Sequence, residues 1–371
     1  MDRDMNEELQ RICEHFRIEG EFLSSEEIKN GNVNHTYRVE YLSPKGKRKS
    51  YILQKVNTYA FHHPVEIMEN IDLITEHIHA KQPKRTALHF HHTPEGKTYL
   101  FDESGFWRLF NYIESDTFND CENLEVVRNA GEAFGEFQYL LSDIDVSKVY
   151  DTTPGFHDTR MRYAKMIADM KEDPLGRVAE VREELDFLLA EQDRACQITD
   201  LYNAGALPLR VAHNDTKINN VLFEKETHRA LVVIDLDTIM PGLISHDFGD
   251  AIRYAANVVP EDCPDCDKVA VNMDVFRAFA DGFLSQTADI LTEREIDTLA
   301  ISGYVLACEL ATRFLDDYII GDPYFHIGYP THNLVRTRCQ IAFAKKLLEK
   351  QDEMDAIIRE CVQKYRGTKH E

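Results

Sequence analysis

The sequence has 371 residues, of which 43% are hydrophobic, and its formal net charge is −23 at pH 7. This length is sufficient for two packed domains, and the hydrophobic fraction excludes disorder as the dominant state. The excess of acidic residues argues against a nucleic-acid or anionic-membrane partner, because neutralising phosphates requires a basic surface. The composition therefore excludes a class of partners without naming a function.

The N-terminal segment 1–16 is acidic and amphipathic and has no basic start followed by an apolar run, so we expect no signal peptide. No uninterrupted apolar stretch approaches the roughly 18 residues that span a bilayer. The eight cysteines are spread along the chain, as in proteins of a reducing cytosol. Cys263 and Cys266 form one C-x-x-C without a second pair at zinc-site spacing, and their neighbours favour a loop. The sequence predicts a soluble cytoplasmic protein.

The chain up to about Glu114 has strand-like patterns. Four short apolar runs predict two hairpins: Thr36–Tyr41 with Tyr51–Val56, and Thr98–Phe101 with Phe106–Ile113. Between the hairpins, the segment 64–80 carries apolar residues at helical spacing. We therefore expect a small sheet packed on a single helix.

Beyond Asn123 the patterns are mostly helical, with one β interruption at Asn220–Asp237. Examples of the expected helices are Leu124–Ser142, Leu175–Thr199, Val275–Gln286, Glu293–Tyr318 and Asn333–Tyr365. The sequence thus predicts an α+β fold with a small β-rich lobe at 1–114 and a large, mainly helical lobe at 115–371.

The stretch 213–237 reads HNDTKINNVLFEKETHRALVVIDLD, in which two apolar runs flank a polar segment, the pattern of a hairpin. With the turn centred at 227–228, Asn220 pairs with Asp235, and directly opposed residues lie about 5 Å apart. Asp237 follows two residues later on the same face. Amide and carboxylate oxygens gathered in this way suit Mg²⁺, so we predict a magnesium site at this end of the hairpin.

Asp215 precedes Asn220 by five residues and is flanked by loop-forming polar residues. A carboxylate on a loop beside a metal can accept the proton of an attacking hydroxyl while the metal neutralises phosphates. The spacing H-x-D-x-x-x-x-N, followed by an aspartate that ends an apolar strand, is a reduced form of the kinase catalytic loop. We predict that Asp215 is the base of a phosphotransferase, and we expect His213 to be structural.

The segments HNDTKINN and VVIDLDTIMPG resemble the aminoglycoside phosphotransferase and choline kinase superfamily, and within it they are most similar to the N-acetylhexosamine 1-kinases. The similarity extends over nearly the whole chain, through GNVNHTYRV, YILQKVN, FGEFQ, RFLDDYIIGDPYF and HNLVRTRCQ. It implies a protein-kinase-like two-lobed fold, ATP with Mg²⁺, and phosphorylation of the anomeric hydroxyl of N-acetylglucosamine or N-acetylgalactosamine.

The resemblance assigns Asp215 as the catalytic base and Asn220 and Asp235 as metal ligands. Arg313 and Tyr324 match positions that line the sugar pocket of the resembled kinases. On the residues alone, Arg313 has an alternative, which is an ion pair within its own helix. The acidic residues at helical spacing from it are Glu309, Asp316 and Asp317.

Two further features follow the same resemblance. Lys217 can face the transferring phosphate, with a solvated lysine as the alternative. Asp247 and Asp250, in SHDFGDAIR, both resemble the superfamily's structural aspartate that braces the catalytic loop, and the sequence does not choose between them.

The small lobe departs from the general kinase pattern. The segment Asn30–Tyr37 has one glycine, and its Asn32 and Asn34 either offer amides to the phosphates or sugar or form a plain polar turn. The segment 110–113, which contains Asn111 and Tyr112, is expected to supply backbone groups to adenine.

Gln54 falls where a phosphate-contacting lysine is expected, and Lys55 follows it. Alternation along a strand places these two side chains on opposite faces, so either the register slips by one or Gln54 is a neutral phosphate donor. The usual glutamate partner of that lysine is equally open. The candidates are Glu66, Glu69 and Asp72.

Three rival interpretations remain. The acceptor can be another small molecule, such as choline, homoserine, methylthioribose or an aminoglycoside, for which the acidic residues near Arg313 would suit a cation. The chain can be a non-catalytic kinase-like binding protein. A protein kinase is disfavoured, because no D-F-G followed by A-P-E comes after Asp235. We expect a monomer, since the fold completes its cleft within one chain.

Overall fold

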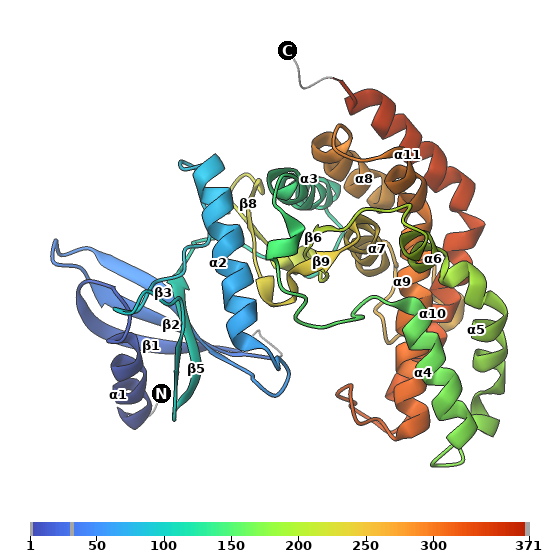
Figure 1. Cartoon of the computed structure of the whole chain (residues 1–371), viewed down its shortest axis with the longest axis horizontal. Helices are drawn as coiled ribbons and strands as arrows, with labels where there is room; N and C mark the ends of the chain where they lie inside the picture. Colours follow the sequence, from blue (N-terminus) through green and yellow to red (C-terminus); the bar gives the residue numbers. More distant parts are fainter. Residues whose placement is uncertain (1–2, 30–32, 368–371) are drawn as a thin grey trace. The chain divides into compact units, whose positions relative to one another are not determined.

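A computed structural model describes residues 3–29 and 33–367, and the chain divides into two compact units (Figure 1). The first unit contains Met1–Asp116 and two short later segments, Ser147–Thr152 and Ile234–Ile239. The remainder forms the second unit. The boundary expected between residues 114 and 115 assigns both later segments to the second lobe. They belong to the first unit because they pack with it across a long sequence separation.

The first unit is built on a five-stranded antiparallel sheet in the order β1-β2-β3-β5-β4. Its strands are β1 (Glu21–Ile28), β2 (His35–Leu42), β3 (Arg48–Val56), β4 (Leu100–Asp102) and β5 (Gly105–Asn111). The pairings of β2 with β3 and of β4 with β5 confirm both predicted hairpins. Strand β1 was missed, because its sequence EFLSSEEI lies at a sheet edge and shows no apolar alternation.

Helices α1 (Arg3–Cys13) and α2 (Pro64–Lys81) lie against opposite faces of this sheet (Figure 1). Leu9 and Ile12 of α1 pack with Leu53 and Trp107 in one apolar cluster. Helix α2 confirms the helix predicted between the hairpins, and its buried residues include Ile67, Met68, Ile71 and Ile74.

Asn70 on α2 binds both later segments of the first unit. Its amide nitrogen donates to the carbonyl oxygens of Tyr150 at 2.8 Å and Ile239 at 3.0 Å, and its amide oxygen accepts from the Tyr150 backbone N–H at 2.8 Å. Since Asn70 is only 1% exposed, these bonds satisfy a buried side chain. One helix of the small unit therefore holds two pieces of chain that come from far along the sequence.

The second unit is mainly helical. Its helices are α3 (Leu124–Leu141), α4 (Thr159–Glu172), α5 (Arg182–Ala195), α6 (Gln197–Asn203), α7 (Ile244–Ala255), α8 (Met273–Thr287), α9 (Glu293–Ile320), α10 (His332–Glu349) and α11 (Gln351–Tyr365). The predicted helices at 124–142, 275–286 and 293–318 are confirmed. The helix expected at 333–365 is instead two helices that meet at Lys350, and α4 and α7 were missed.

Helix α9 is the central helix of the second unit, with α4, α5, α7 and α10 packed against it (Figure 1). It is long and apolar enough to cross a membrane by composition alone, but 89% of its most apolar window is buried inside the protein. A buried apolar helix of this kind is a core helix of a folded domain.

Candidate active site

A short hairpin, β7 (Val221–Phe223) with β8 (Ala230–Val233), follows the catalytic-loop motif. The hairpin confirms the prediction, but its register does not. Val221 pairs with Val233, one residue away from the expected register, and the ladder ends there without reaching Asp235. The physical reason is a bulge between Leu222 and Phe223, together with a left-handed backbone at Asp235 (φ 60°) that is incompatible with an extended strand.

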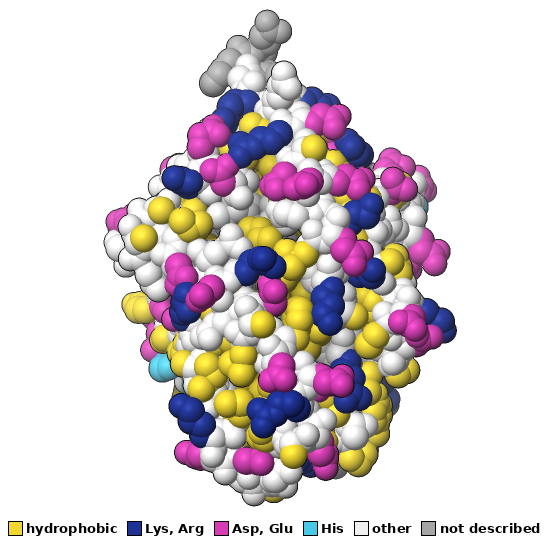
Figure 2. Space-filling model, turned by 90° about the vertical axis from the view of Figure 1, so that its right-hand side faces the viewer, with side chains coloured by type: hydrophobic (Ala, Val, Ile, Leu, Met, Phe, Trp, Pro, Cys, Tyr) yellow, Lys and Arg dark blue, Asp and Glu magenta, His cyan; other side chains and the backbone are white. Residues whose placement is uncertain are grey.

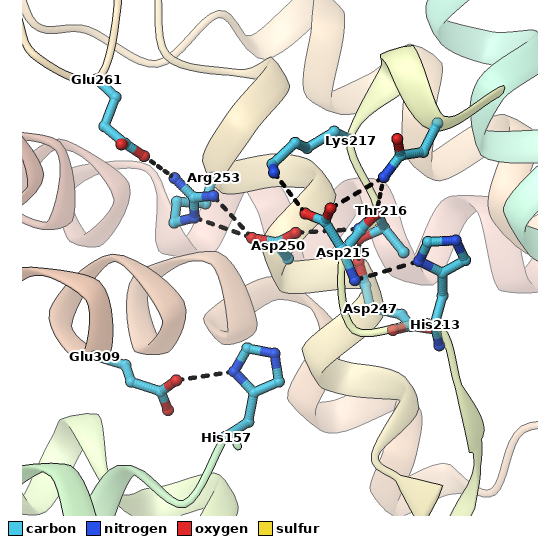
Figure 3. A network of polar contacts seen from close by, with 11 residues as sticks. His157, His213, Asp215, Thr216, Lys217, Asp247, Asp250, Arg253, Glu261 and Glu309 are labelled. Carbon is cyan, nitrogen blue, oxygen red and sulfur yellow. Dashed lines mark hydrogen bonds and ion pairs between the residues drawn. The ribbon is translucent and has the colours of Figure 1, made fainter. Parts of the chain in front are cut away.

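The Asp215 carboxylate is held from two sides (Figure 3). One oxygen lies 2.7 Å from the Lys217 ammonium nitrogen, and the other accepts from the Asn220 amide nitrogen at 3.1 Å. Asn220 also donates to the Asp215 backbone carbonyl at 2.8 Å. The structure therefore brings together Asp215, Lys217 and Asn220, with the Asp215 side chain 24% exposed.

Lys217 remains cationic in this position. Burial alone would lower its pKa, but the neighbouring Asp215 carboxylate outweighs burial and raises the pKa. The Lys217 ammonium therefore places a positive charge 2.7 Å from the Asp215 carboxylate.

Asp247 on α7 holds the start of the catalytic loop. Its carboxylate accepts from the backbone N–H groups of His213 at 2.9 Å and Asn214 at 2.8 Å, and from the Gln138 amide at 2.7 Å. His213 is fully buried against the rings of Phe134 and Phe137, as expected for a structural histidine.

Asp250, one turn later on α7, holds the next part of the loop (Figure 3). It accepts from the Thr216 backbone N–H at 3.1 Å and from the Arg253 guanidinium at 2.9 Å, and Arg253 also binds Glu261 at 2.7 Å. Burial alone would raise the pKa of Asp250, but Arg253 and Lys217 lower it. The sequence could not choose between Asp247 and Asp250, and both brace the loop.

Arg313 on α9 lies among three aromatic rings. Its guanidinium carbon is 5.9 Å from the ring centre of Phe156, 5.7 Å from that of Tyr324 and 5.4 Å from that of Phe325. Within residues 3–29 and 33–367, no hydrogen bond or ion pair involves its side chain. Its donors are therefore available to a ligand.

The ion pair within α9 that was the alternative for Arg313 does not form, because each neighbouring carboxylate has another partner. Glu309 accepts from Thr159 and lies 2.8 Å from the His157 ring nitrogen Nδ1. Asp316 pairs with Lys165, and Asp317 accepts from Asn333 at 2.9 Å.

Tyr324 lies on a turn that is folded back onto the end of α9. Gly321 (φ 101°) and Asp322 (φ 61°) reverse the chain, and Asp317 accepts from the backbone N–H of Tyr324 and of Phe325, each at 2.9 Å. The Tyr324 side chain is 71% exposed, so its ring is free to contact a ligand on one side.

In the first unit, Gln54 and Lys55 lie on opposite faces of β3, as alternation predicts. Gln54 faces the α2 side, where its amide nitrogen donates to the Thr36 hydroxyl at 3.0 Å and its oxygen accepts from Arg108 at 2.9 Å. Lys55 lies on the α1 side, with its ammonium 5.3 Å from the ring centre of Trp107. Of the two, only Gln54 shares a face with α2.

Asp237 is buried in an ion pair with Arg108 of β5. Both Arg108 terminal nitrogens bind its two carboxylate oxygens, and the Asn34 amide donates to it at 2.8 Å. The two paired side chains are 4% and 2% exposed. Both carboxylate oxygens of Asp237 therefore already have partners within the protein. Its role as a metal ligand is not tested by these contacts and stays a prediction. Asn32 lies outside the described residues.

Asn111 and Tyr112 follow the end of β5. The Asn111 side chain accepts from the His89 backbone N–H at 2.7 Å and donates to the Ala87 carbonyl at 3.1 Å. The Tyr112 ring is covered by the Arg38 guanidinium at 4.4 Å. Their backbone N–H groups also have partners, the carbonyl oxygens of His89 at 3.1 Å and Ser50 at 3.3 Å. The adenine contact of this segment stays a prediction.

The sequence interpretation missed Arg108 and His157. Arg108 interrupts the apolar strand GFWRLFN, and a cation at an inward position of a strand was a usable signal for a buried partner. His157 is in an irregular segment before α4, where no periodicity marks it.

The chain matches the model of the phosphotransferase enzyme family over residues 24–269. Its fold is similar to that of an aminoglycoside phosphotransferase from Alicyclobacillus acidocaldarius, with a TM-score of 0.60, 12% identity and 96% of each chain covered. A spectinomycin phosphotransferase solved with ADP and spectinomycin gives 0.56 at 13% identity, covering 92% of this chain and 98% of that one. A choline kinase from Cryptosporidium parvum gives 0.55 at 14% identity, covering 96% and 99%. The protein therefore has the two-lobed, protein-kinase-like fold, and it belongs to the phosphotransferase enzyme family.

Proposed function

We propose that this protein is an ATP-dependent kinase that phosphorylates the anomeric hydroxyl of an N-acetylhexosamine, giving the sugar 1-phosphate. Arg313 is the observation that carries the acceptor class, because its unpaired donors and its aromatic surroundings suit a neutral, oxygen-rich ligand. A cationic acceptor such as choline or an aminoglycoside would be repelled by Arg313, since the nearby carboxylates are engaged elsewhere.

In the proposed reaction, the acceptor hydroxyl oxygen attacks the γ-phosphorus of ATP, the bond from that phosphorus to the bridging oxygen breaks, and ADP leaves. Asp215 accepts the hydroxyl proton, and the Lys217 ammonium lies 2.7 Å from its carboxylate. We assign Lys217 to the transferring phosphoryl group, and Arg313 and Tyr324 to the sugar.

We assign Asn220 and Asp235 to a magnesium ion. The Asn220 amide nitrogen donates to Asp215, which leaves its oxygen, a ligand that suits Mg²⁺, for a cation. In the part of the chain that the structure describes, no three His, Cys, Asp or Glu side chains form a metal-binding group. A cation that takes few protein ligands and keeps its waters agrees with that finding. When bound, the ion would neutralise phosphate charge.

For the nucleotide we retain main-chain groups of Asn111 and Tyr112. Asn34, Gln54 and Lys55 remain predicted contacts, with Gln54 on the α2 side of the sheet and Lys55 on the α1 side. We place the enzyme in the cytoplasm as a monomer.

The test is ADP release by the purified protein with ATP and Mg²⁺ across a panel of acceptors. The panel contains N-acetylglucosamine, N-acetylgalactosamine, glucose, choline, homoserine, methylthioribose and kanamycin. We expect turnover only with the N-acetylated sugars, and Arg313→Ala should raise their KM at least about tenfold without changing the KM for ATP. Turnover confined to choline or kanamycin would refute the sugar assignment while retaining the kinase.

The base is tested separately. Asp215→Asn should lower kcat by roughly 10²–10⁴-fold, the range for removing a general base, while ADP affinity stays within about twofold. Asp186→Asn, on an exposed position of α5, is the matched control and should have wild-type kinetics. Undiminished turnover by Asp215→Asn would remove Asp215 from the mechanism.

A further inference from the structure

The buried Arg108–Asp237 ion pair lies on the α2 side of the small sheet, next to Gln54, where a phosphate-contacting lysine would be expected. In the ladder between β3 and β5, Arg108 pairs directly with Gln54. Arg108 could therefore contact the phosphates in place of the missing lysine, or it could orient other residues of the site.

The Arg108 guanidinium has little capacity left for a phosphate. Its Nε donates to Gln54 at 2.9 Å, its two terminal nitrogens bind both oxygens of Asp237, and one of them also contacts the Met68 sulfur at 3.8 Å. The side chain is 4% exposed, and its guanidinium carbon lies 5.9 Å from the Phe90 ring centre. A fork–fork pair of this kind fixes the orientation of both partners.

Arg108 holds the segment Ile234–Ile239, which is bound to the rest of the first unit by three side chains. Arg108 and Asn34 bind the Asp237 carboxylate, and Asn70 binds the Ile239 carbonyl at 3.0 Å. Asn34 is itself oriented by the Asn57 backbone N–H at 2.9 Å.

Asp235 lies two residues before Asp237 and has a left-handed backbone (φ 60°, ψ 58°). A non-glycine residue in this region persists only where the surrounding structure imposes it. The direction of the Asp235 side chain therefore depends on the anchoring of the residues that follow it.

We infer that the Arg108–Asp237 ion pair is a positioning device that orients the Asp235 carboxylate for the divalent cation, and that neither partner contacts the cation or the phosphates. This inference rests on the proposed function, in which Asp235 is a cation ligand. It assigns the two consecutive acidic residues of the IDLD motif to different tasks, one to the ion and one to the protein.

The test measures cation and nucleotide binding without turnover. Wild type, Arg108→Met, Asp237→Leu and the double variant are titrated with Mn²⁺ in the presence of ADP, with bound Mn²⁺ followed by electron paramagnetic resonance. ADP binding is measured separately in EDTA. The double variant replaces a buried ion pair by apolar side chains, which proteins often tolerate without loss of stability, so it keeps the test valid if a single variant does not fold.

We expect all folded variants to weaken Mn²⁺ binding at least tenfold while ADP affinity in EDTA changes less than about twofold, and the effects of the single variants should not add. Arg108→Lys should recover part of the loss. The matched control is Arg48→Met, which removes the arginine of an exposed ion pair with Glu40 in the same sheet and should bind as wild type.

Other outcomes separate the alternatives. Weaker ADP binding in EDTA by Arg108→Met would make Arg108 a phosphate ligand, and loss of Mn²⁺ binding in Asp237→Leu but not in Arg108→Met would make Asp237 a cation ligand; either result overturns the inference. Folded variants with wild-type binding would overturn it alone. A wild-type protein without cation-dependent ADP binding would overturn the proposed function and the inference together.

Discussion

At the residue scale, Asp215 shows how a short loop gives a carboxylate two charged or polar neighbours. Lys217 and Asn220 reach it from positions two and five residues later, so the local sequence spacing supplies both contacts. The sequence interpretation placed these three residues in one site, with Lys217 at the phosphate and Asn220 at the metal. It did not predict their contacts with the Asp215 carboxylate.

The contacts of Gln54, unlike those of Asp215, come from residues far away in the sequence. Its residue type and strand position were known from the sequence, but its two partners, Thr36 and Arg108, come from neighbouring strands. The hydrogen bonds of a side-chain amide depend on which residues lie opposite it on the neighbouring strands. Only the tertiary structure could therefore show that the amide nitrogen and the amide oxygen of Gln54 both have partners.

Glu309 carries a prediction on acid stability. It is fully buried and faces His157 and Thr159, with His246 and Arg162 nearby. Burial alone would raise its pKa, but His157, its hydrogen bond and the other neighbours lower it from 4.5 to about 2. A carboxyl group with a lowered folded-state pKa stabilises the protein above its ordinary pKa, and this stabilisation is lost as the pH falls toward 2.

We therefore expect Glu309→Gln to lower the free energy of unfolding at pH 7 by on the order of 3 kcal/mol, and this difference from wild type should shrink by about 1 kcal/mol at pH 4. Urea unfolding across this pH range measures it. Glu353→Gln, on an exposed position of α11, is the control. A difference that stays constant with pH would show that ionisation of Glu309 contributes nothing to stability.

At the scale of elements, α3 and α8 approach so closely that their contact requires glycine. A Cβ atom on Gly282 would lie 2.0 Å from the Arg128 carbonyl oxygen, and one on Gly131 would lie 2.4 Å from that of Phe279. Gly135 has the same constraint against Phe283. Because these obstacles are backbone atoms, the helices must separate to accept a side chain.

We predict that Gly282→Ala lowers the free energy of unfolding by roughly 1–3 kcal/mol, the usual cost of overpacking, even though alanine favours a helix. Thermal or urea unfolding measures the change. Gly328→Ala is the control, since its added Cβ would meet only a His332 ring atom at 3.9 Å. A Gly282→Ala protein as stable as wild type would mean that the helix pair shifts at no cost.

Helix α7 shows why some helices were not predicted from the sequence. It is buried almost throughout, yet it carries His246, Asp247, Asp250 and Arg253. These polar residues obscure the apolar periodicity that identifies a helix. Asp247 and Asp250 accept from backbone N–H groups of the loop, and Arg253 binds Asp250. The polar side chains of α7 that hold residues 213–216 thus hid its secondary structure from the sequence pattern.

At the scale of the whole molecule, the main feature is the excess of acidic over basic residues. On the face drawn in Figure 2, basic side chains are interspersed with acidic and hydrophobic ones and do not gather into a stripe. The sequence contains 65 acidic and 42 basic residues. An excess of this size destabilises the compact state through self-repulsion, and salt screens it.

We predict that raising KCl from about 0.05 to about 0.3 M increases the thermal unfolding midpoint at pH 7, because the Debye length falls below the spacing of many surface charges. The gain should vanish at a pH close to the isoelectric point, which serves as the control. A midpoint that falls with salt at pH 7 would mean that local ion pairs, and not net repulsion, dominate the electrostatic free energy.

The sequence by itself determined the fold class, the two main hairpins and most long helices. These features depend on periodicity and on short spacings, which are readable along one chain. Only the tertiary structure decided the partner of Asp237, the isolation of Arg313 from its helical neighbours and the joint role of Asp247 and Asp250. Each of these depends on residues more than 30 positions apart or on competition among several carboxylates, and one-dimensional spacing carries no information about which partner prevails.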